Sequence, residues 1–261
     1  MEHSETSQLA YNQQAFKAGD DIEITLKMHG TSQRTAYVPV FKGYKRRNLV
    51  EILTGKKKQP IYKYDYISGT RRTIIDTDKS GGFYGSHEFR EVHSNKFKDK
   101  LMKGETVYYE VVGFTNTGTP IMGDASNKKT NDKEFIKQYG ETTRFSYGCS
   151  ATGEFNDEAE ENKLGDLPNL PKSDMYVYRM TITNEDGFVV EYTPEFMRYR
   201  CEQMGVKTVP VMIRFRIPVD CATPGEYVRN IAEQYYDGPD PIGKTHIREG
   251  VVCRITNRPN F

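Results

Sequence analysis

Alternation between apolar and polar residues is the feature of this sequence that most limits its possible folds. A two-residue period is typical of β-strands with one buried face. It recurs in seven segments, which we predict to be strands: 21–27, 60–66, 106–113, 175–183, 187–193, 209–217 and 249–255. An Asp-Gly pair at 186–187 joins two of them and favours a tight hairpin turn. The chain is therefore expected to be built mainly on antiparallel sheet.

Helical periodicity is rarer and is found in four segments, 45–53, 131–139, 194–204 and 225–236. Thr193 and Thr223 each precede a proline at the start of a predicted helix, which is the pattern of an N-cap followed by a first-turn proline. The fold class is therefore α+β. The polar segment 115–173 lies between two predicted strands, and we interpret it as an insertion or long excursion.

Composition excludes several classes of protein. The 261 residues contain no apolar run near the ~20 residues that span a bilayer, and the N-terminus lacks the basic and apolar regions of a secretory signal. The four cysteines are scattered and form no CxxC pair, which argues against a zinc ribbon or a disulfide framework: Cys149, Cys201, Cys221 and Cys253. We expect a cytoplasmic protein in a reduced setting, with no membrane partner.

The net charge is only +1, but the charges are unevenly distributed. Segment 42–72 is rich in lysine, arginine and tyrosine and contains two acids. It is either a solvated loop or a surface that contacts phosphate or nucleic acid. The acidic segment 154–166 and the glycine-rich segment 80–87 are expected to be solvated or flexible loops.

Several familiar catalytic motifs are missing. The sequence contains no GxxxxGK[ST], no GxGxxG after a strand and no GxSxG. His87 and His93 are too isolated to indicate a metal site. If the chain is an enzyme, its nucleophile must be of another kind.

Lys27 is the most informative single residue. It ends the first predicted strand and is followed by a tight polar turn in "KMHGTS". A lysine with its reference pKa of ~10.4 is a poor nucleophile at neutral pH, but burial or nearby cations lower the pKa and activate the amine. A following glycine allows close approach of a phosphate. The alternative is an ordinary surface lysine at the end of a strand.

Four segments in order bear a clear family resemblance. "KMHG", "YEVVG", "MYVYRM" and "EGVVCR" resemble motifs I, III, IIIa and IV of ATP-dependent polynucleotide ligases and capping enzymes. Histidine in the third place of motif I, followed by "GTS", is similar to the RNA ligase 2-like family. The resemblance implies an ATP-grasp-like nucleotidyltransferase core of antiparallel sheets with flanking helices, forming one adenylyltransferase domain over 1–261 with an insertion at about 115–173.

The resemblance also implies roles for particular residues. Lys27 would take AMP as a lysine–adenylate, Glu110 would bind the ribose hydroxyls, and Tyr178 would stack on adenine. Glu249 would act near the lysine and a metal ion. The nucleotide-binding residues implied by the motifs are Leu26, His29, Gly30, Ser32, Arg72, Glu110, Tyr178, Glu249 and Arg254, with Arg71 as the neighbour of the favoured Arg72.

The implied activity is that of an ATP-dependent RNA ligase. It would use ATP with Mg²⁺ or Mn²⁺, move AMP to an RNA 5′-phosphate and seal that end to a 3′-hydroxyl. We expect a monomeric, phage- or cell-encoded protein of RNA repair. No KxK pair of motif V follows Glu249, and no C-terminal domain is present, so we expect nucleotide binding with weak self-adenylation. The alternatives are a DNA ligase, a GTP-using capping enzyme, or an inactive nucleotide- or RNA-binding module.

Overall fold

The computed structural model describes residues 6–75, 84–152 and 170–258. The strands are β1 (Asp21–Lys27), β2 (Thr31–Tyr44), β3 (Pro60–Thr70), β4 (Glu105–Gly113), β5 (Asp124–Ser126), β6 (Thr142–Arg144), β7 (Ser173–Thr183), β8 (Val189–Glu191), β9 (Val211–Arg216) and β10 (Gly250–Ile255). The α-helices are α1 (Leu49–Leu53), α2 (Glu88–Ser94), α3 (Lys133–Tyr139), α5 (Pro194–Met204) and α6 (Pro224–Tyr236). Short 3-10 turns are η1 (Leu9–Tyr11), η2 (Gln13–Ala15), η4 (Asn95–Phe97) and η5 (Asn127–Lys129).

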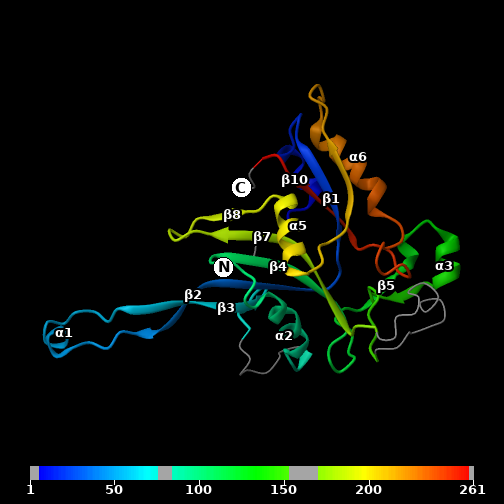
Figure 1. Ribbon diagram of the computed structural model, residues 1–261. Helices are drawn as coiled ribbons and strands as arrows, with labels where there is room; N and C mark the ends of the chain where they lie inside the picture. Colours follow the sequence, from blue (N-terminus) through cyan, green and yellow to red (C-terminus); the bar gives the residue numbers. More distant parts are fainter. Residues whose placement is uncertain (1–5, 76–83, 153–169, 259–261) are drawn as a thin grey trace.

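Two antiparallel sheets form the centre of the molecule (Figure 1). The larger has the strand order β3-β2-β4-β7-β8, and the smaller has the order β10-β1-β9. Side chains of both sheets meet in one buried cluster, which contains Leu26 of β1 together with Val112 and Tyr176 of the larger sheet. The predicted α+β class with antiparallel sheets is confirmed.

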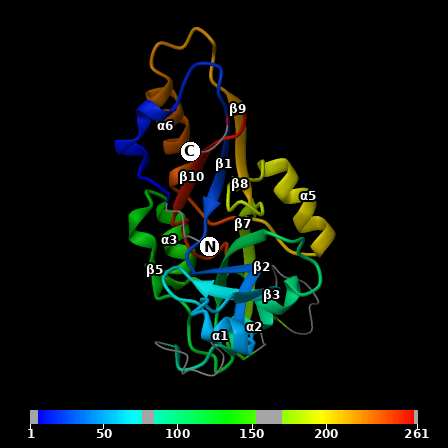
Figure 2. The same cartoon turned by 90° about the vertical axis from the view of Figure 1, so that its left-hand side faces the viewer.

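Helices cover the outer faces of the two sheets (Figure 2). α6 packs on the smaller sheet, where Val228 and Ala232 contact Ile22 and Ile24 of β1. α2 and α5 pack on the larger sheet through a cluster that includes Phe89, Met197, Val107, Tyr109 and Val177. Lys27 of β1 and Glu110 of β4 have the opposite parity to the residues of their strands that pack in these helix clusters, so they lie on the other face of each strand.

The helix starting at Pro194 forms as the sequence predicts. The side chain of Thr193 accepts a hydrogen bond from the backbone N–H of Phe196, and Gly205 ends the helix in the left-handed conformation. The matching prediction for Thr223 is wrong in one respect, because its side chain makes no capping hydrogen bond to α6. There the proline at the first turn starts the helix without help from the preceding hydroxyl.

The largest difference from the sequence prediction is β2, a strand of 14 residues that the periodicity did not reveal. Its polar first half and the central Pro39 hide the alternation, and its register with β3 shifts between Phe41 and Gly43. β3 runs on to Thr70, beyond the predicted end. In the predicted helix 45–53, only Leu49–Leu53 is helical. α2 was not predicted.

The polar segment 115–173 contains the two-stranded sheet of β5 and β6. The helix α3 lies between these strands, in the place predicted for 131–139. The acidic run 154–166 and residues 80–83 of the glycine-rich segment lie outside the described residues. None of the cysteines, all four of which are described, forms a disulfide. In the described part of the chain, no helix has the length and apolar character needed to cross a membrane.

Candidate active site

Lys27 lies at the end of β1, directly opposite Gly250 of β10. This pairing places Glu249 beside it, and the Lys27 Nζ lies 2.6 Å from Glu249 Oε1. The second carboxylate oxygen, Oε2, lies 3.2 Å from Nδ1 of His29. The Lys27 side chain is 48% exposed, so its amine remains open to a substrate. Strand pairing thus brings together two motif residues that are far apart in the sequence.

Glu249 stays ionised despite its position. Burial acts to raise the pKa of its carboxyl, but hydrogen bonds from His29 and Lys27 outweigh burial, and the net pKa lies below the usual value. Its loop is fixed by Arg248, whose guanidinium donates to the backbone oxygens of Tyr235 and Pro239 at the end of α6. The site therefore holds a negative charge between the amine and the imidazole at neutral pH.

Gly30 allows the turn after Lys27 to lie directly on β4. A Cβ at this position would meet the backbone oxygen of Val111 and come within 2.9 Å of the side chains of Glu110 and Val112. The lack of a side chain at Gly30 therefore allows the turn to approach the neighbouring strand β4 closely. The Gly30 N–H also donates to the carboxyl of Glu110.

Glu110 faces this turn from β4, opposite Ser32 of β2. Burial, followed by the nearby charge of Glu249, raises the pKa of Glu110 to about 8, although Arg90, Lys27 and the Gly30 N–H act in the opposite direction. Glu110 is therefore largely protonated at neutral pH. A neutral carboxyl both donates and accepts hydrogen bonds, which suits a hydroxyl group that can also do both.

Tyr178 of β7 joins the same group of residues. Its hydroxyl lies 3.0 Å from Oγ of Ser32, and burial raises the pKa of the phenol to about 12. Its ring packs against the cluster that contains Leu26 and Tyr176. Leu26 itself is buried, and its backbone N–H donates to the carbonyl oxygen of Pro210. Lys27, His29, Gly30, Ser32, Glu110, Tyr178 and Glu249 are brought together by the fold.

Two aromatic residues of the segment 115–173 contact His29 of the site, and the sequence analysis did not identify them. The buried hydroxyl of Tyr147 accepts a hydrogen bond of 2.8 Å from the backbone N–H of His29. Phe145 packs against the His29 ring with centroids 4.5 Å apart. His246 contacts both aromatic rings. The alternating aromatics in "RFSYG" were the available signal, but their long sequence separation from Lys27 concealed the contact.

The predicted arginines lie farther out. Arg72 is exposed in the turn after β3, at the same end of the sheet as Ser32, because Thr70 pairs with Gln33. Arg254 is opposite Glu23, four positions along the strands from the Lys27–Gly250 pair, and donates to the backbone oxygen of Tyr178 at 2.9 Å.

A third arginine, Arg90 of α2, was missed by the sequence analysis. It is buried and donates to Oγ1 of Thr31 at 2.6 Å. Its charge also acts on Glu110. Arg90 belongs to none of the family motifs. The sequence therefore gave no sign that it lies beside Thr31 and Glu110.

Solved structures of an RNA ligase share this architecture. Two structures of a Naegleria gruberi RNA ligase, one with PPi and one an arginine-to-alanine variant with ATP and Mn, match the chain with a TM-score of 0.50 and 13% sequence identity. The matches cover 98% of this chain and 53% of the ligase chains, so this chain spans about half the length of those proteins. The chain has an RNA ligase-like nucleotidyltransferase fold. Neither a protein-family model nor a curated protein sequence matches it.

This fold accounts for the position of the site. The end of β1 and the strands β4 and β7 supply the side chains, and the ammonium and carboxylate charges lie where the two sheets meet. Within residues 6–75, 84–152 and 170–258, no group of three His, Cys, Asp or Glu side chains is arranged to hold a metal ion. Any divalent cation bound here would need ligands from the substrate as well as from Glu249.

Proposed function

We propose that this chain is the nucleotidyltransferase part of an ATP-dependent RNA ligase and that Lys27 carries AMP during the reaction. The observation that carries the proposal is the half-exposed Lys27 amine, 2.6 Å from an ionised Glu249, in a nucleotidyltransferase fold. Glu110 of β4 and Tyr178 of β7 lie beside this pair. The four resembling motifs, in order, supply further support.

In the first step, Nζ of Lys27 attacks the α-phosphorus of ATP. The nitrogen–phosphorus bond forms as the bond from that phosphorus to the pyrophosphate oxygen breaks, and pyrophosphate leaves. The Lys27 ammonium first passes one proton through Glu249, its hydrogen-bond partner, to solvent, which frees the lone pair that attacks; the second proton leaves by the same route once the nitrogen–phosphorus bond has formed. His29 keeps the Glu249 carboxylate in place through its second oxygen.

The remaining site residues bind and orient the nucleotide. Glu110 takes the ribose hydroxyls, and Tyr178 offers a π-face to the adenine. Arg72 and Arg254 are assigned to the phosphates, Arg72 from an exposed turn and Arg254 from its place behind Tyr178. Ser32 fixes the Tyr178 hydroxyl, Leu26 supports the turn from the buried cluster, and Gly30 lets the turn lie on β4.

A single carboxylate together with substrate phosphates and water is the ligand set that Mg²⁺ favours, so Glu249 fits a Mg²⁺ or Mn²⁺ that arrives with ATP. When bound, this ion neutralises charge on the leaving pyrophosphate. AMP then moves to an RNA 5′-phosphate, and a 3′-hydroxyl displaces it to seal the strand. We also propose that the protein works as an intracellular monomer in RNA repair.

Incubation with Mg²⁺ and α-labelled ATP, followed by denaturing electrophoresis and intact mass, tests the first step. We expect an AMP-sized adduct that is lost in Lys27→Ala and retained in Lys133→Ala, a control at an exposed lysine of α3. An adduct that persists in Lys27→Ala contradicts the proposal.

Substrate choice separates the other candidate activities. Labelled GTP in place of ATP identifies a capping-type enzyme, and a DNA end in place of an RNA end identifies a DNA ligase. Nucleotide binding with no adduct from folded protein indicates a binding module. A GTP adduct, a joined DNA end in place of an RNA end, or nucleotide binding with no adduct at all contradicts the assignment as part of an RNA ligase.

A further inference from the structure

The hairpin of β2 and β3 continues well past the sheet to which it belongs. β2 pairs with β4 only between Thr31 and Ala36, whereas its pairing with β3 continues to Tyr44. The outer part is a two-stranded ribbon that projects away from the body of the molecule (Figure 1). An isolated two-stranded ribbon has no core of its own, so its side chains are available to a partner.

One face of this ribbon is almost entirely aromatic. Residues directly opposite each other share a face, and Tyr37 pairs with Tyr66, Pro39 with Tyr64 and Phe41 with Tyr62. The register shift between Phe41 and Gly43 then returns Tyr44 to the same face, with its ring centroid 5.0 Å from that of Phe41. We call these six rings the aromatic face: Tyr37, Phe41, Tyr44, Tyr62, Tyr64 and Tyr66.

The rings at the outer end of the aromatic face are poorly covered. Phe41 is 46% exposed, Tyr44 58% and Tyr62 59%. Contacts among the rings stabilise the ribbon, as the stacked pair of Tyr37 and Tyr66 at 4.6 Å shows, but they leave the outer rings open to solvent. An exposed row of large apolar groups is characteristic of an interaction surface.

Positive charge surrounds these rings. The Lys58 Nζ lies 6.0 Å from the Tyr44 ring centroid, and the Lys103 Nζ lies 5.1 Å from that of Tyr64. Further basic residues extend along the ribbon and its tip: Lys42, Lys45, Arg46, Arg47, Lys56, Lys57 and Lys63. Among the described residues, neither Lys58 nor Lys63 has an ion-pair partner. The surface therefore suits a polyanion that also has flat groups to stack.

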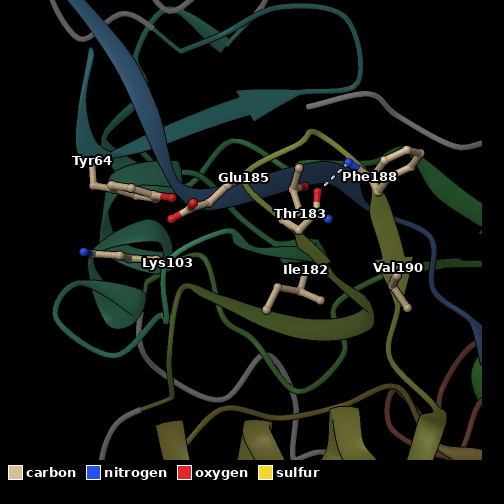
Figure 3. Close-up of a pocket in the computed structure, with 8 residues that line it drawn as sticks. Tyr64, Lys103, Ile182, Thr183, Glu185, Phe188 and Val190 are labelled. Carbon is tan, nitrogen blue, oxygen red and sulfur yellow. Dashed lines mark hydrogen bonds between the residues drawn. The ribbon is translucent and has the colours of Figure 1, made fainter. Parts of the chain in front are cut away.

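A pocket of about 310 Å³ lies at the base of the aromatic face. Tyr64 and Lys103 lie at one end, and Phe188 and Val190 of the β7–β8 hairpin lie at the other (Figure 3). Its walls are mainly apolar, with Glu185 as the acidic group. A flat ring between Tyr64 and Phe188 would extend the aromatic row inwards.

We propose that the aromatic face and this pocket bind single-stranded RNA, with bases stacked on the rings and phosphates near Lys58 and Lys103. The proposal rests on the proposed ligase function for the choice of RNA. Sequence-tolerant binding of single strands combines aromatic stacking with a basic path for the backbone, and both are present here. Duplex RNA keeps its bases stacked inside and cannot use the rings in this way.

This surface is distinct from the Lys27 site. Side chains alternate between the two faces of β2. Tyr37 and Phe41 lie on the aromatic face, whereas Ser32 of the Lys27 site has an even number and lies on the other face. Nine residues separate Ser32 from Phe41, which is about 30 Å of strand. The ribbon would therefore bind RNA remote from the reacting end, and its loss should raise KM for RNA while self-adenylation of Lys27 is unchanged.

Titration of a fluorescent single-stranded RNA with the full chain, in low and moderate salt, tests the site. We expect the double variant Phe41→Ala with Tyr62→Ala to bind roughly tenfold or more weakly, because stacking on one ring is worth about five- to a hundredfold. The matched control is Tyr11→Ala, which removes an exposed ring outside the ribbon. A Leu pair at the same two positions keeps the apolar bulk without the π-face and should also bind weakly.

The possible results are distinguishable. Unchanged affinity in both folded double variants, or duplex RNA bound as tightly as single-stranded RNA, overturns the ribbon proposal even if Lys27 is adenylated. Ring-dependent RNA binding without a Lys27 adduct supports the ribbon and contradicts the ligase function. Glu185→Gln at the pocket should strengthen binding, since it removes a carboxylate near the phosphates; weaker binding argues against this path for the RNA.

Discussion

Replacing Glu110 with glutamine should change how the stability of the protein depends on pH. The folded state holds a proton on Glu110 up to a pKa of about 8, whereas the unfolded chain releases it near 4.5. The raised pKa means that this group stabilises the fold fully below about pH 4.5 and loses that contribution as the pH rises towards 8. Glutamine has no proton to lose, so the variant lacks this dependence.

The size of the effect follows from proton linkage. Within this window the folded state binds one more proton than the unfolded state at Glu110, so the unfolding free energy falls by about 1.4 kcal/mol per pH unit. Between about pH 5.5 and about pH 7.5 the wild type should lose roughly 2.7 kcal/mol relative to Glu110→Gln. Titrating groups that do not interact with Glu110 cancel in the comparison, whereas Glu249, Lys27 and Arg90 interact with it directly.

Urea denaturation of both proteins at about pH 5.5, 6.5 and 7.5 measures this difference. The gap between their unfolding free energies should change steadily in favour of the glutamine variant. A gap that is constant with pH would show that Glu110 ionises normally, and the assignment of a neutral carboxyl beside Glu249 would be refuted. The same pair of proteins can be compared with Glu249→Gln added to both. The Glu110 pKa should then be lower, and the gap should change over a narrower pH range, because the second cause of the shift is removed.

Two further substitutions test the turn after Lys27. Gly30→Ala should cost about 1–3 kcal/mol of stability, because a Cβ meets the backbone of β4, and it should also slow adenylation of Lys27. A wild-type unfolding free energy in urea denaturation, together with a wild-type rate of adduct formation, would contradict this packing. Tyr147→Phe should cost about 1 kcal/mol, since the His29 N–H loses its acceptor, with a slower rate of adduct formation; an unchanged rate in the labelled-ATP assay would show that Tyr147 does not position the turn.

The sequence was most informative where a local rule determines the structure. β1 has clear alternation and ends at Lys27 as expected, and α5 has both its threonine cap and its first-turn proline. The meeting of Lys27 with Glu249 was implied by motif order rather than by any local pattern, and the pairing of β1 with β10 brings the two residues together. The roles of the site residues remain predictions.

Long-range packing accounts for what was missed. β2 depends on β3 and β4 for its pairing, and its proline and register shift break the alternation that would reveal it. Tyr147 reaches His29 across 118 residues, and Arg90 reaches Thr31 across 59. Neither contact follows a fixed sequence spacing, so single-sequence periodicity gives no access to them.

The central position of β1 has a consequence for biosynthesis. Both of its neighbours in the three-stranded sheet, β9 and β10, are made much later, and Lys27 and Glu249 are 222 residues apart. As a chain emerges from the ribosome, β1 has no sheet partner, and both of its edges are open to incorrect pairing until β9 and β10 are made. Lys27 acquires its carboxylate only when β10 closes the sheet. Under the proposed function, a nascent chain would therefore not react with nucleotide before β10 has been synthesised.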